Sequence, residues 1–276
     1  MLKTALTQLF DIRVVGYPKL VAAVSNAGGI ITALSQPSPT ALRQAIRETR
    51  TLTDKPFGVN ITLAPTINPP DYEGFARAAI EEGVKIFETA GNNRAGLPGE
   101  DDIGGLVLLA RAAKELKIPY IASGGFADGR GLAAALALGA AGINMGTRFM
   151  CTVESSIHEN IKHKIVQSTE HDTIHIYRTL HNTARVFKNK VSTEVVAIEK
   201  RPGGAKFEDI RDLVSGQRGR VVFETGDPDH GIWSAGLTIG LINDIPTCQE
   251  LLERMEHEAE EIIGNMSSLV TPKVKL

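Results

Sequence analysis

Two short segments carry the residues whose types and spacing could bind a phosphate. Ser123, Gly124 and Gly125 follow one short apolar run, and Gly146 and Thr147 follow the next. Glycines let backbone amides approach an anion closely, and a threonine hydroxyl adds a further donor. In β/α barrels the loops after the seventh and eighth strands commonly bind phosphate. The pattern therefore predicts a nucleotide cofactor. An ordinary βαβ crossover remains the alternative, because glycine-rich loops alone are weak signals.

Other residues extend this candidate site. Asn144 and Met145 end the second run, and the Arg148 guanidinium is expected to converge on the same spot. Asn60, at the end of a further predicted strand, could offer a donor and an acceptor to a ring edge, or it could cap a turn. Trp233 and Ser234 lie among small residues and are expected on the substrate side, although a lone tryptophan fits core packing equally well.

The elements that must position these residues alternate as in a parallel α/β fold. We expect strands at 29–34, 57–63, 84–89, 119–122 and 142–145, a stub at 12–15, and helices at 18–27, 39–52, 71–82, 103–116, 132–138 and 247–263. Residues 1–150 and 236–276 are predicted to form the barrel. Residues 151–235 are predicted to form a smaller, mainly helical domain that covers the substrate.

The chain resembles the nitronate monooxygenase family, formerly called 2-nitropropane dioxygenases, in its bacterial branch that also contains NADH:quinone reductases. Beyond the two glycine loops, the resemblance rests on motifs that run in order to about Pro246, namely Asn26–Gly29, Gln36–Pro39, Pro56–Leu63, Glu88–Gly91, Pro98–Asp102, Asn182–Arg185, Ser215–Gly219 and Gly231–Gly236. It implies a TIM (β/α)8-type barrel that binds FMN through Asn60, Ser123, Gly124, Gly125, Asn144, Met145, Gly146 and Thr147.

The catalytic base is where the chain departs from the family. The family has a histidine in an Ala-Gly-His-Pro-Gly pattern, whereas this chain reads Ala95-Gly96-Leu97-Pro98-Gly99. Leucine cannot take a proton, so the base is unknown. His181, beside the Asn182–Arg185 motif, is a weak candidate.

The chain also looks too short for eight strand and helix units. We predict that two units are missing between Glu88–Gly91 and Pro98–Asp102, and that the loop after the first strand is missing between Arg13 and Gly16. A break in the chain predicts consecutive Cα atoms far beyond ~3.8 Å within 92–95 and near 15–16, whereas a true deletion predicts normal spacing.

Composition agrees with a cytoplasmic enzyme. The chain has 276 residues, 42% of them hydrophobic, and a formal net charge of −2. No run approaches the roughly 18 apolar residues of a membrane span, there is no basic field for nucleic acid, and the two cysteines lack metal-ligand spacing. We expect neither membrane nor nucleic-acid partners and no metal, and the oligomeric state stays open.

The resemblance implies a flavin oxidoreductase that uses O2 to convert alkyl nitronates into carbonyl compounds and nitrite. An NAD(P)H:quinone reductase is an alternative, since the same barrel serves both chemistries. A barrel that binds flavin or another phosphate ligand without turnover is a further alternative, favoured by Leu97.

Overall fold

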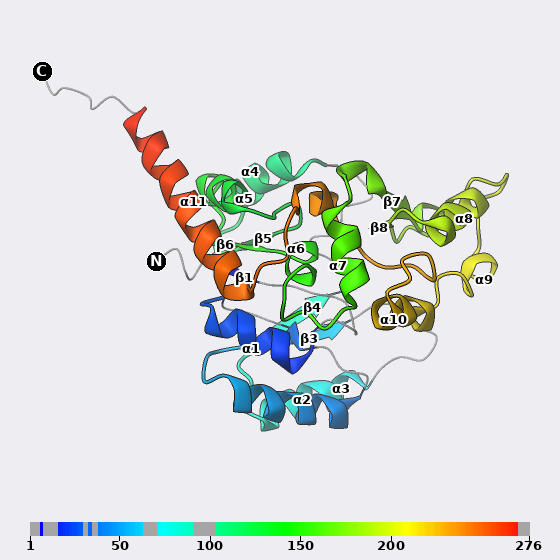
Figure 1. Cartoon of the computed structure of the whole chain (residues 1–276), viewed down its shortest axis with the longest axis horizontal. Helices are drawn as coiled ribbons and strands as arrows, with labels where there is room; N and C mark the ends of the chain where they lie inside the picture. Colours follow the sequence, from blue (N-terminus) through cyan, green and yellow to red (C-terminus); the bar gives the residue numbers. More distant parts are fainter. Residues whose placement is uncertain are drawn as a thin grey trace, which may run out of the picture.

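The computed structural model describes residues 6–7, 16–29, 33–34, 38–62, 71–90 and 103–269. These residues form an α/β body of parallel strands surrounded by helices, with a smaller lobe projecting from one side (Figure 1).

The parallel strands fall into two sheets, with the orders β1–β6–β5 and β2–β3–β4. Their bounds are β1 Leu6–Thr7, β2 Ala33–Leu34, β3 Gly58–Thr62, β4 Ile86–Ala90, β5 Ile121–Ser123 and β6 Gly142–Asn144. β1 pairs with β6, so the first and last parallel strands are neighbours, as the closure of a barrel requires. The predicted strands thus lie close to where the sequence placed them, except that the stub at 12–15 is outside the described residues.

The helices follow the predicted order. They are α1 Pro18–Asn26, α2 Pro39–Leu52, α3 Tyr72–Glu81, α4 Gly105–Glu115, α5 Gly129–Ala137, α6 Thr147–Met150, α7 Glu159–Val166, α8 Lys190–Glu199, α9 Phe207–Ile210, α10 Gly216–Thr225 and α11 Cys248–Ser268. Side-chain caps set several starts: Ser38, Asp71 and Asp128 each accept a hydrogen bond from the backbone of the first turn.

One large hydrophobic core joins the parallel sheet to the C-terminal helix. Its buried residues include Leu132 on α5, Ile143 on β6 and Met255 on α11. α11 packs directly on α5 at Gly129, where an added Cβ would lie only 2.6 Å from the Met255 carbonyl oxygen and 2.6 Å from Glu258 Cβ. Glycine is therefore required for this close helix crossing. The Gly129 backbone amide also donates to Glu258 Oε2 at 2.8 Å.

The small lobe, residues 173–214, contains an antiparallel hairpin that the sequence analysis did not predict. β7 Thr173–Ile176 pairs with β8 Ala184–Phe187, and the lobe has its own core around Ile176, Val186 and Ile198. The β-branched residues of β7 favour a strand over a helix. Elsewhere residues 151–235 are mostly helical, and part of this segment, including Ile161 and Phe223, packs into the large core. The boundaries of the smaller domain stay a prediction.

Helix α4 exposes an apolar surface. It has no buried residue, and Leu106 and Val107 are 70% and 66% exposed. The described residues contain no strand between β4 and β5, where the sequence predicted that two barrel units are missing. The predicted breaks within 92–95 and near 15–16 stay untested, because residues 92–95 and residue 15 lie outside the described residues. None of the described helices has the length and apolar character needed to cross a membrane.

We predict that Leu106→Glu leaves the free energy of unfolding within ~0.5 kcal/mol of wild type and reduces self-association, because it places a charge in an exposed apolar patch. Leu132→Glu is the buried control and should prevent folding, since Leu132 has no exposed surface. Denaturant unfolding and light scattering test both. Equal destabilisation by the two substitutions would show that another segment covers α4.

Candidate active site

The candidate site is built on the parallel pairing of β5 and β6. In this register Ser123 lies opposite Asn144, so both strands end at the same level. Asn144 is only 3% exposed, and its Nδ2 donates to Ser123 Oγ at 2.9 Å. Its Oδ1 is buried and has no hydrogen-bond partner among the described residues. A buried acceptor without a partner is costly, which suggests that a ligand supplies the missing donor.

The loop after β5 is shaped by two consecutive glycines in the left-handed region. Gly124 has φ 84° and Gly125 has φ 88°, values that L side chains rarely adopt. No atom of the described residues lies within 4 Å of the position where a Cβ on Gly125 would be, and both glycines are exposed. The backbone of this loop is therefore open to a ligand.

The loop after β6 is tied to a distant segment. Gly146 is followed directly by α6, and Thr147 Oγ1 accepts a hydrogen bond from the Gly236 amide at 2.9 Å. This contact brings the Gly231–Gly236 motif to the end of β6, as the predicted site requires. Because the Thr147 oxygen is the acceptor, the hydroxyl keeps its own proton to donate elsewhere.

Trp233 belongs to the core and not to the substrate side. It is 2% exposed, it stacks on Phe187 with ring centroids 4.4 Å apart, and its Nε1 donates to the Pro228 carbonyl at 3.1 Å. The expectation that Trp233 contacts the substrate is therefore wrong in this structure, since an indole this buried touches only protein. Ser234, the next residue, is exposed and forms an isolated bridge with Val186 on β8.

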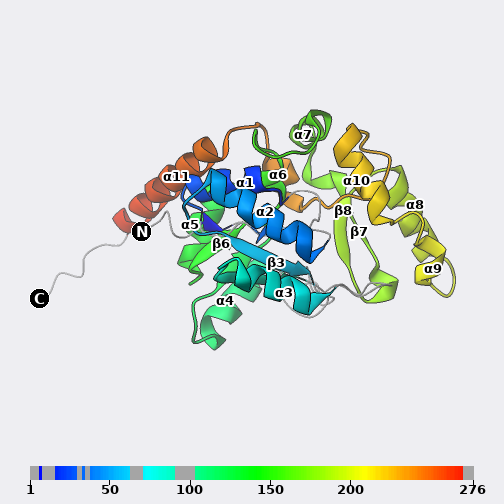
Figure 2. The same cartoon turned by 90° about the horizontal axis from the view of Figure 1, so that it is seen from below.

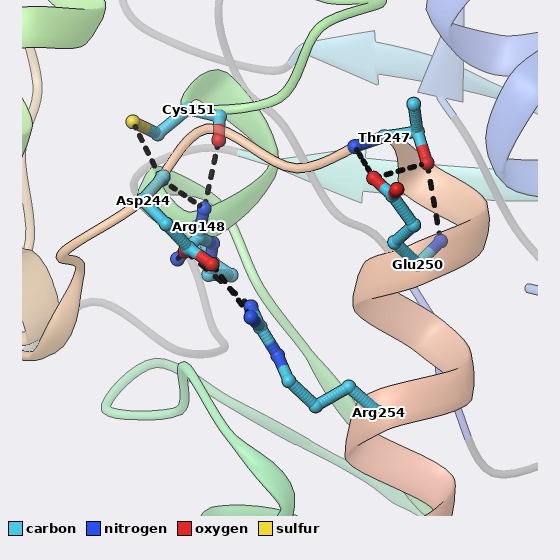
Figure 3. Close-up of polar contacts among 6 residues, drawn as sticks. All are labelled: Arg148, Cys151, Asp244, Thr247, Glu250 and Arg254. Carbon is cyan, nitrogen blue, oxygen red and sulfur yellow. Dashed lines mark hydrogen bonds and ion pairs between the residues drawn. The ribbon is translucent and has the colours of Figure 1, made fainter.

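The expected role of Arg148 in anion binding is also wrong. Its Nη1 donates to Asp244 Oδ1 at 3.0 Å, and its Nη2 donates to the carbonyls of Cys151 and Asp244, both at 2.8 Å. Arg254 on α11 holds the other carboxylate oxygen of Asp244 at 2.6 Å (Figure 3). Arg148 thus clamps α6 to the segment before α11.

Charge and burial explain why this clamp is strong. Arg148 is 2% exposed, and burial lowers its pKa, although an arginine stays protonated. Burial raises the pKa of the Asp244 carboxyl, but the hydrogen bond from Arg254 and the charge of Arg148 outweigh this effect and hold the pKa below its usual range. The clamp therefore joins a buried cation to an ionised carboxylate.

A helix cap lies beside the clamp. The Thr247 hydroxyl and the Glu250 side chain cap the start of α11 (Figure 3).

The Cys151 thiol is buried. Burial raises the pKa of this thiol to about 11, so Cys151 is not a nucleophile at neutral pH.

The remaining predicted site residues differ in burial and in the element that carries them. Asn60 is buried on β3, in the second sheet and opposite Glu88. The Met145 side chain is 1% exposed in the large core, so only its backbone could meet a cofactor. His181 is exposed at the end of the hairpin turn with φ 50°, and no acid or base in the described residues contacts its ring. Leu97 lies outside the described residues.

A cavity of about 350 Å³ lies elsewhere, between residues 50–57 and 83–86. It is at the amino ends of β3 and β4, whereas barrel enzymes act at the carboxyl ends. We therefore assign no chemistry to it.

The sequence did not reveal Asp244, the Thr147–Gly236 contact or the β7–β8 hairpin. Asp244 and Arg148 are 96 residues apart, so no local spacing signals their contact. A weaker signal was available for the hairpin in the alternation of Thr173-Ile174-His175-Ile176.

The sequence and the fold of this chain are similar to those of known proteins. The sequence profile of the nitronate monooxygenase family matches residues 11–73 and 74–258. FabK from Thermotoga maritima has a solved structure that superposes with a TM-score of 0.84 at 30% identity, covering 97% of this chain and 96% of FabK.

Two curated relatives match over most of their length. A Rhodococcus jostii enzyme named (3aS,4S,5R,7aS)-5-hydroxy-7a-methyl-1-oxo-octahydro-1H-indene-4-carboxyl-CoA dehydrogenase is 28% identical over 358 aligned positions, covering 97% of this chain and 99% of the relative. The nitronate monooxygenase of Paraburkholderia phytofirmans is 26% identical over 91% of both chains. The first alignment is longer than this 276-residue chain and so contains gaps on its side.

We predict that Asp244→Ala lowers the free energy of unfolding by ~3 kcal/mol, because it leaves the buried Arg148 without its counter-charge. The value is at the low end for a buried pair, since Asp244 is itself 34% exposed. Glu115→Gln is the control: it removes the exposed Arg111–Glu115 pair and should cost less than ~1 kcal/mol.

The pH dependence gives an independent check. Because the folded-state pKa of Asp244 lies below its unfolded value, its stabilisation is complete above the unfolded pKa and disappears as the pH falls through the folded pKa. Denaturant melts should therefore show the Asp244→Ala deficit at pH 7 shrinking with acidification. A deficit that stays constant would mean that the carboxylate charge is not what stabilises the clamp.

Proposed function

Because this chain belongs to the nitronate monooxygenase family, we propose that it is an FMN-dependent oxidoreductase that oxidises alkyl nitronates with O2 to carbonyl compounds and nitrite. The predicted family is confirmed by the match to most of the chain, and the predicted α/β TIM-barrel fold class by the likeness to FabK. The chain is thus a flavin-dependent enzyme. The choice of FMN and the residues that hold it are our proposal.

The observation that carries this proposal is the pair of loops at the ends of β5 and β6. A flavin mononucleotide needs donors around its phosphate and polar partners for its ribityl hydroxyls. The amides of Gly124, Gly125 and Gly146 and the Thr147 hydroxyl are of the first kind. Asn144 Oδ1, buried without a partner among the described residues, is of the second kind. The groups present therefore fit FMN.

Ser123 fits the same role. Its Oγ accepts the hydrogen bond from Asn144 Nδ2, so its hydroxyl proton is left to donate to the cofactor. Ser123 and Asn144 would thus bind the ribityl chain as a donor and acceptor pair, held in position by the strand register.

When bound, the flavin supplies an electron acceptor for the substrate and passes the electrons on to O2. The chain must bind and orient an already anionic substrate, because position 97 is a leucine and provides no base to remove the α-proton of a neutral nitroalkane. A nitronate has lost that proton before it binds.

The direct test is to purify the chain, record its absorption spectrum, and measure O2 uptake and nitrite release with an alkyl nitronate. We expect a flavin band, FMN in the supernatant after denaturation, and nitrite formed with the carbonyl product. A colourless protein that does not take up FMN would refute the cofactor. A yellow protein that forms no nitrite would refute the substrate.

A second candidate is oxidation or reduction of an acyl-CoA thioester, favoured by the Rhodococcus jostii dehydrogenase that aligns with 97% of this chain. An NAD(P)H:quinone reductase is a third, as the sequence suggested. Stopped-flow reduction of the bound flavin by nitronate, NADH, NADPH and a saturated acyl-CoA separates these cases, because only a true electron donor bleaches the flavin band rapidly.

We predict that Gly125→Asp raises the dissociation constant for FMN at least tenfold, because a carboxylate at this position repels the phosphate. Gly203→Asp is a matched control with the same new charge and a similar backbone, since Gly203 has φ 90° and also faces open space. Fluorescence titration of flavin-free protein measures both constants. Equal affinity in the two variants would show that the phosphate does not bind beside Gly125.

We predict that Leu97→His raises kcat/KM for a neutral nitroalkane by roughly 10²- to 10⁴-fold, the usual contribution of a positioned base, and leaves the nitronate value unchanged. Leu97→Gln is polar but does not titrate near neutral pH, so it should show no gain. Rates on both substrate forms across a pH series test this. If the unmodified chain already uses both forms equally, another group, with His181 the first candidate, is the base.

A further inference from the structure

The β7–β8 hairpin has two chemically different faces. Residues opposite one another in an antiparallel pair share a face. The Ile174–Val186 and Ile176–Ala184 pairs form one face and pack into the core of the small lobe. The other face carries Thr173, His175, Arg185 and Phe187. The hairpin thus has an apolar side toward its own lobe and a cationic side away from it.

The cationic side is turned toward the barrel. Phe187 on this face stacks on Trp233 and belongs to the large core, and its amide donates to the Trp233 carbonyl at 3.0 Å. In Figure 2 the arrowhead of β3 marks the carboxyl end of that strand, and the hairpin lies beyond this end. Catalytic groups of β/α barrels gather at this end.

Two backbone contacts link the hairpin to the candidate cofactor site. Val186 bridges to Ser234, and the Gly236 amide, two residues further on, binds Thr147 Oγ1. Arg185 therefore lies beside a strand residue that is held to the loop after β6. It belongs to the Asn182–Arg185 motif, to which the proposed function assigns no role.

Arg185 is half-buried and lies near a second guanidinium, that of Arg178. Its Nη1 donates to Thr173 Oγ1 at 3.0 Å, and among the described residues no carboxylate contacts it. Its cross-strand partner His175 contacts the Arg178 guanidinium through Nδ1 at 2.8 Å. Burial lowers the pKa of Arg185, and the charge of Arg178 lowers it further. An arginine cannot escape this cost by losing its proton, so a bound anion would relieve it.

The turn that carries these groups is held rigidly. Tyr177 has φ 65°, a strained value for a tyrosine, and Glu199 on α8 accepts hydrogen bonds from its amide at 3.1 Å and from the Thr179 amide and hydroxyl at 3.3 and 3.1 Å. Backbone strain that is held in place by buried contacts is typical of binding sites.

We propose that Arg185 forms an oxyanion subsite that binds the two negatively charged oxygens of the nitronate group. The proposal rests on the proposed function and deepens it. A guanidinium presents two parallel N–H donors, which match a planar group with two oxygens. The subsite would select the anionic substrate form, the form that a chain with leucine at position 97 requires.

Kinetics provide the first test. We expect Arg185→Gln to lower kcat/KM for an alkyl nitronate by about 10- to 150-fold, the loss of a hydrogen bond to a charged group, and Arg185→Lys to recover part of it. Flavin content and the rate of reduction of the neutral acceptor 1,4-benzoquinone by the dithionite-reduced enzyme should not change. Arg211→Gln removes the same charge from an exposed site in the small lobe and should match wild type.

Direct anion binding provides the second test, and it needs no turnover. Nitrate, a planar oxyanion, is titrated into the holoenzyme by calorimetry at fixed ionic strength. We expect saturable binding to wild type and Arg211→Gln and at least tenfold weaker binding to Arg185→Gln. Absence of saturable binding to wild type, or equal binding to all three, would overturn the subsite.

The two tests separate the proposals. Nitrate binding that depends on Arg185, without any nitronate oxidation, would leave the anion subsite standing and refute the proposed function. Nitronate oxidation that is equal in Arg185→Gln and Arg211→Gln would refute the subsite and leave the function standing. If Arg185→Gln instead weakens only flavin reduction by NADPH, the subsite recognises a nucleotide phosphate, and the nitronate assignment is overturned.

Discussion

The arrangement of the site depends on the parallel pairing of β5 with β6. This register places Ser123 opposite Asn144 at the ends of the two strands, and Asn144 Nδ2 donates a hydrogen bond to Ser123 Oγ at 2.9 Å. Both glycine loops start from this point, so the strand pairing fixes their separation before any ligand binds. A shift by one residue would turn Asn144 to the other face of the sheet and separate the loops. Parallel pairing is thus the constraint from which the cofactor groups, Thr147 and the contacts beyond it follow.

Two layers of contacts hold this centre in place. On one side the Arg148–Asp244–Arg254 clamp ties α6 to α11, so the residues that follow the second loop cannot swing away from the barrel. On the other side Thr147 accepts a hydrogen bond from the Gly236 amide, and Trp233, three residues before Gly236, stacks on Phe187. Neither layer contributes a ligand group of its own except at Thr147. Their effect is to hold short loops at fixed positions, which preorganised binding requires.

Local patterns in the sequence were sufficient for the barrel but not for its long-range contacts. Apolar runs and periodicity located β2 to β6, the helices α1 to α5 and α11, because these signals act within a few residues, whereas β1 was not predicted. The residue types that follow two predicted strands gave the predicted cofactor-binding residues Ser123, Gly124, Gly125, Asn144 and Thr147. Arg148 and Trp233 were misassigned since their partners, Asp244 and Phe187, are far away in sequence and neither spacing nor composition indicates the contact. The hairpin was missed because a His- and Thr-rich segment was read as helical.

The distribution of charge in this fold has a consequence for substrate choice. With a net charge of −2 the chain as a whole does not attract anions, so any preference for an anionic ligand must come from local groups. We propose two such places near the same end of the strands: the backbone amides with the Thr147 hydroxyl, and Arg185 of the hairpin. Amide donors suit a phosphate held without change through the reaction, whereas the arginine fork suits a smaller planar anion that must enter and leave. A substrate that arrives already ionised then needs no base at position 97, and the leucine there is consistent with the rest of the site.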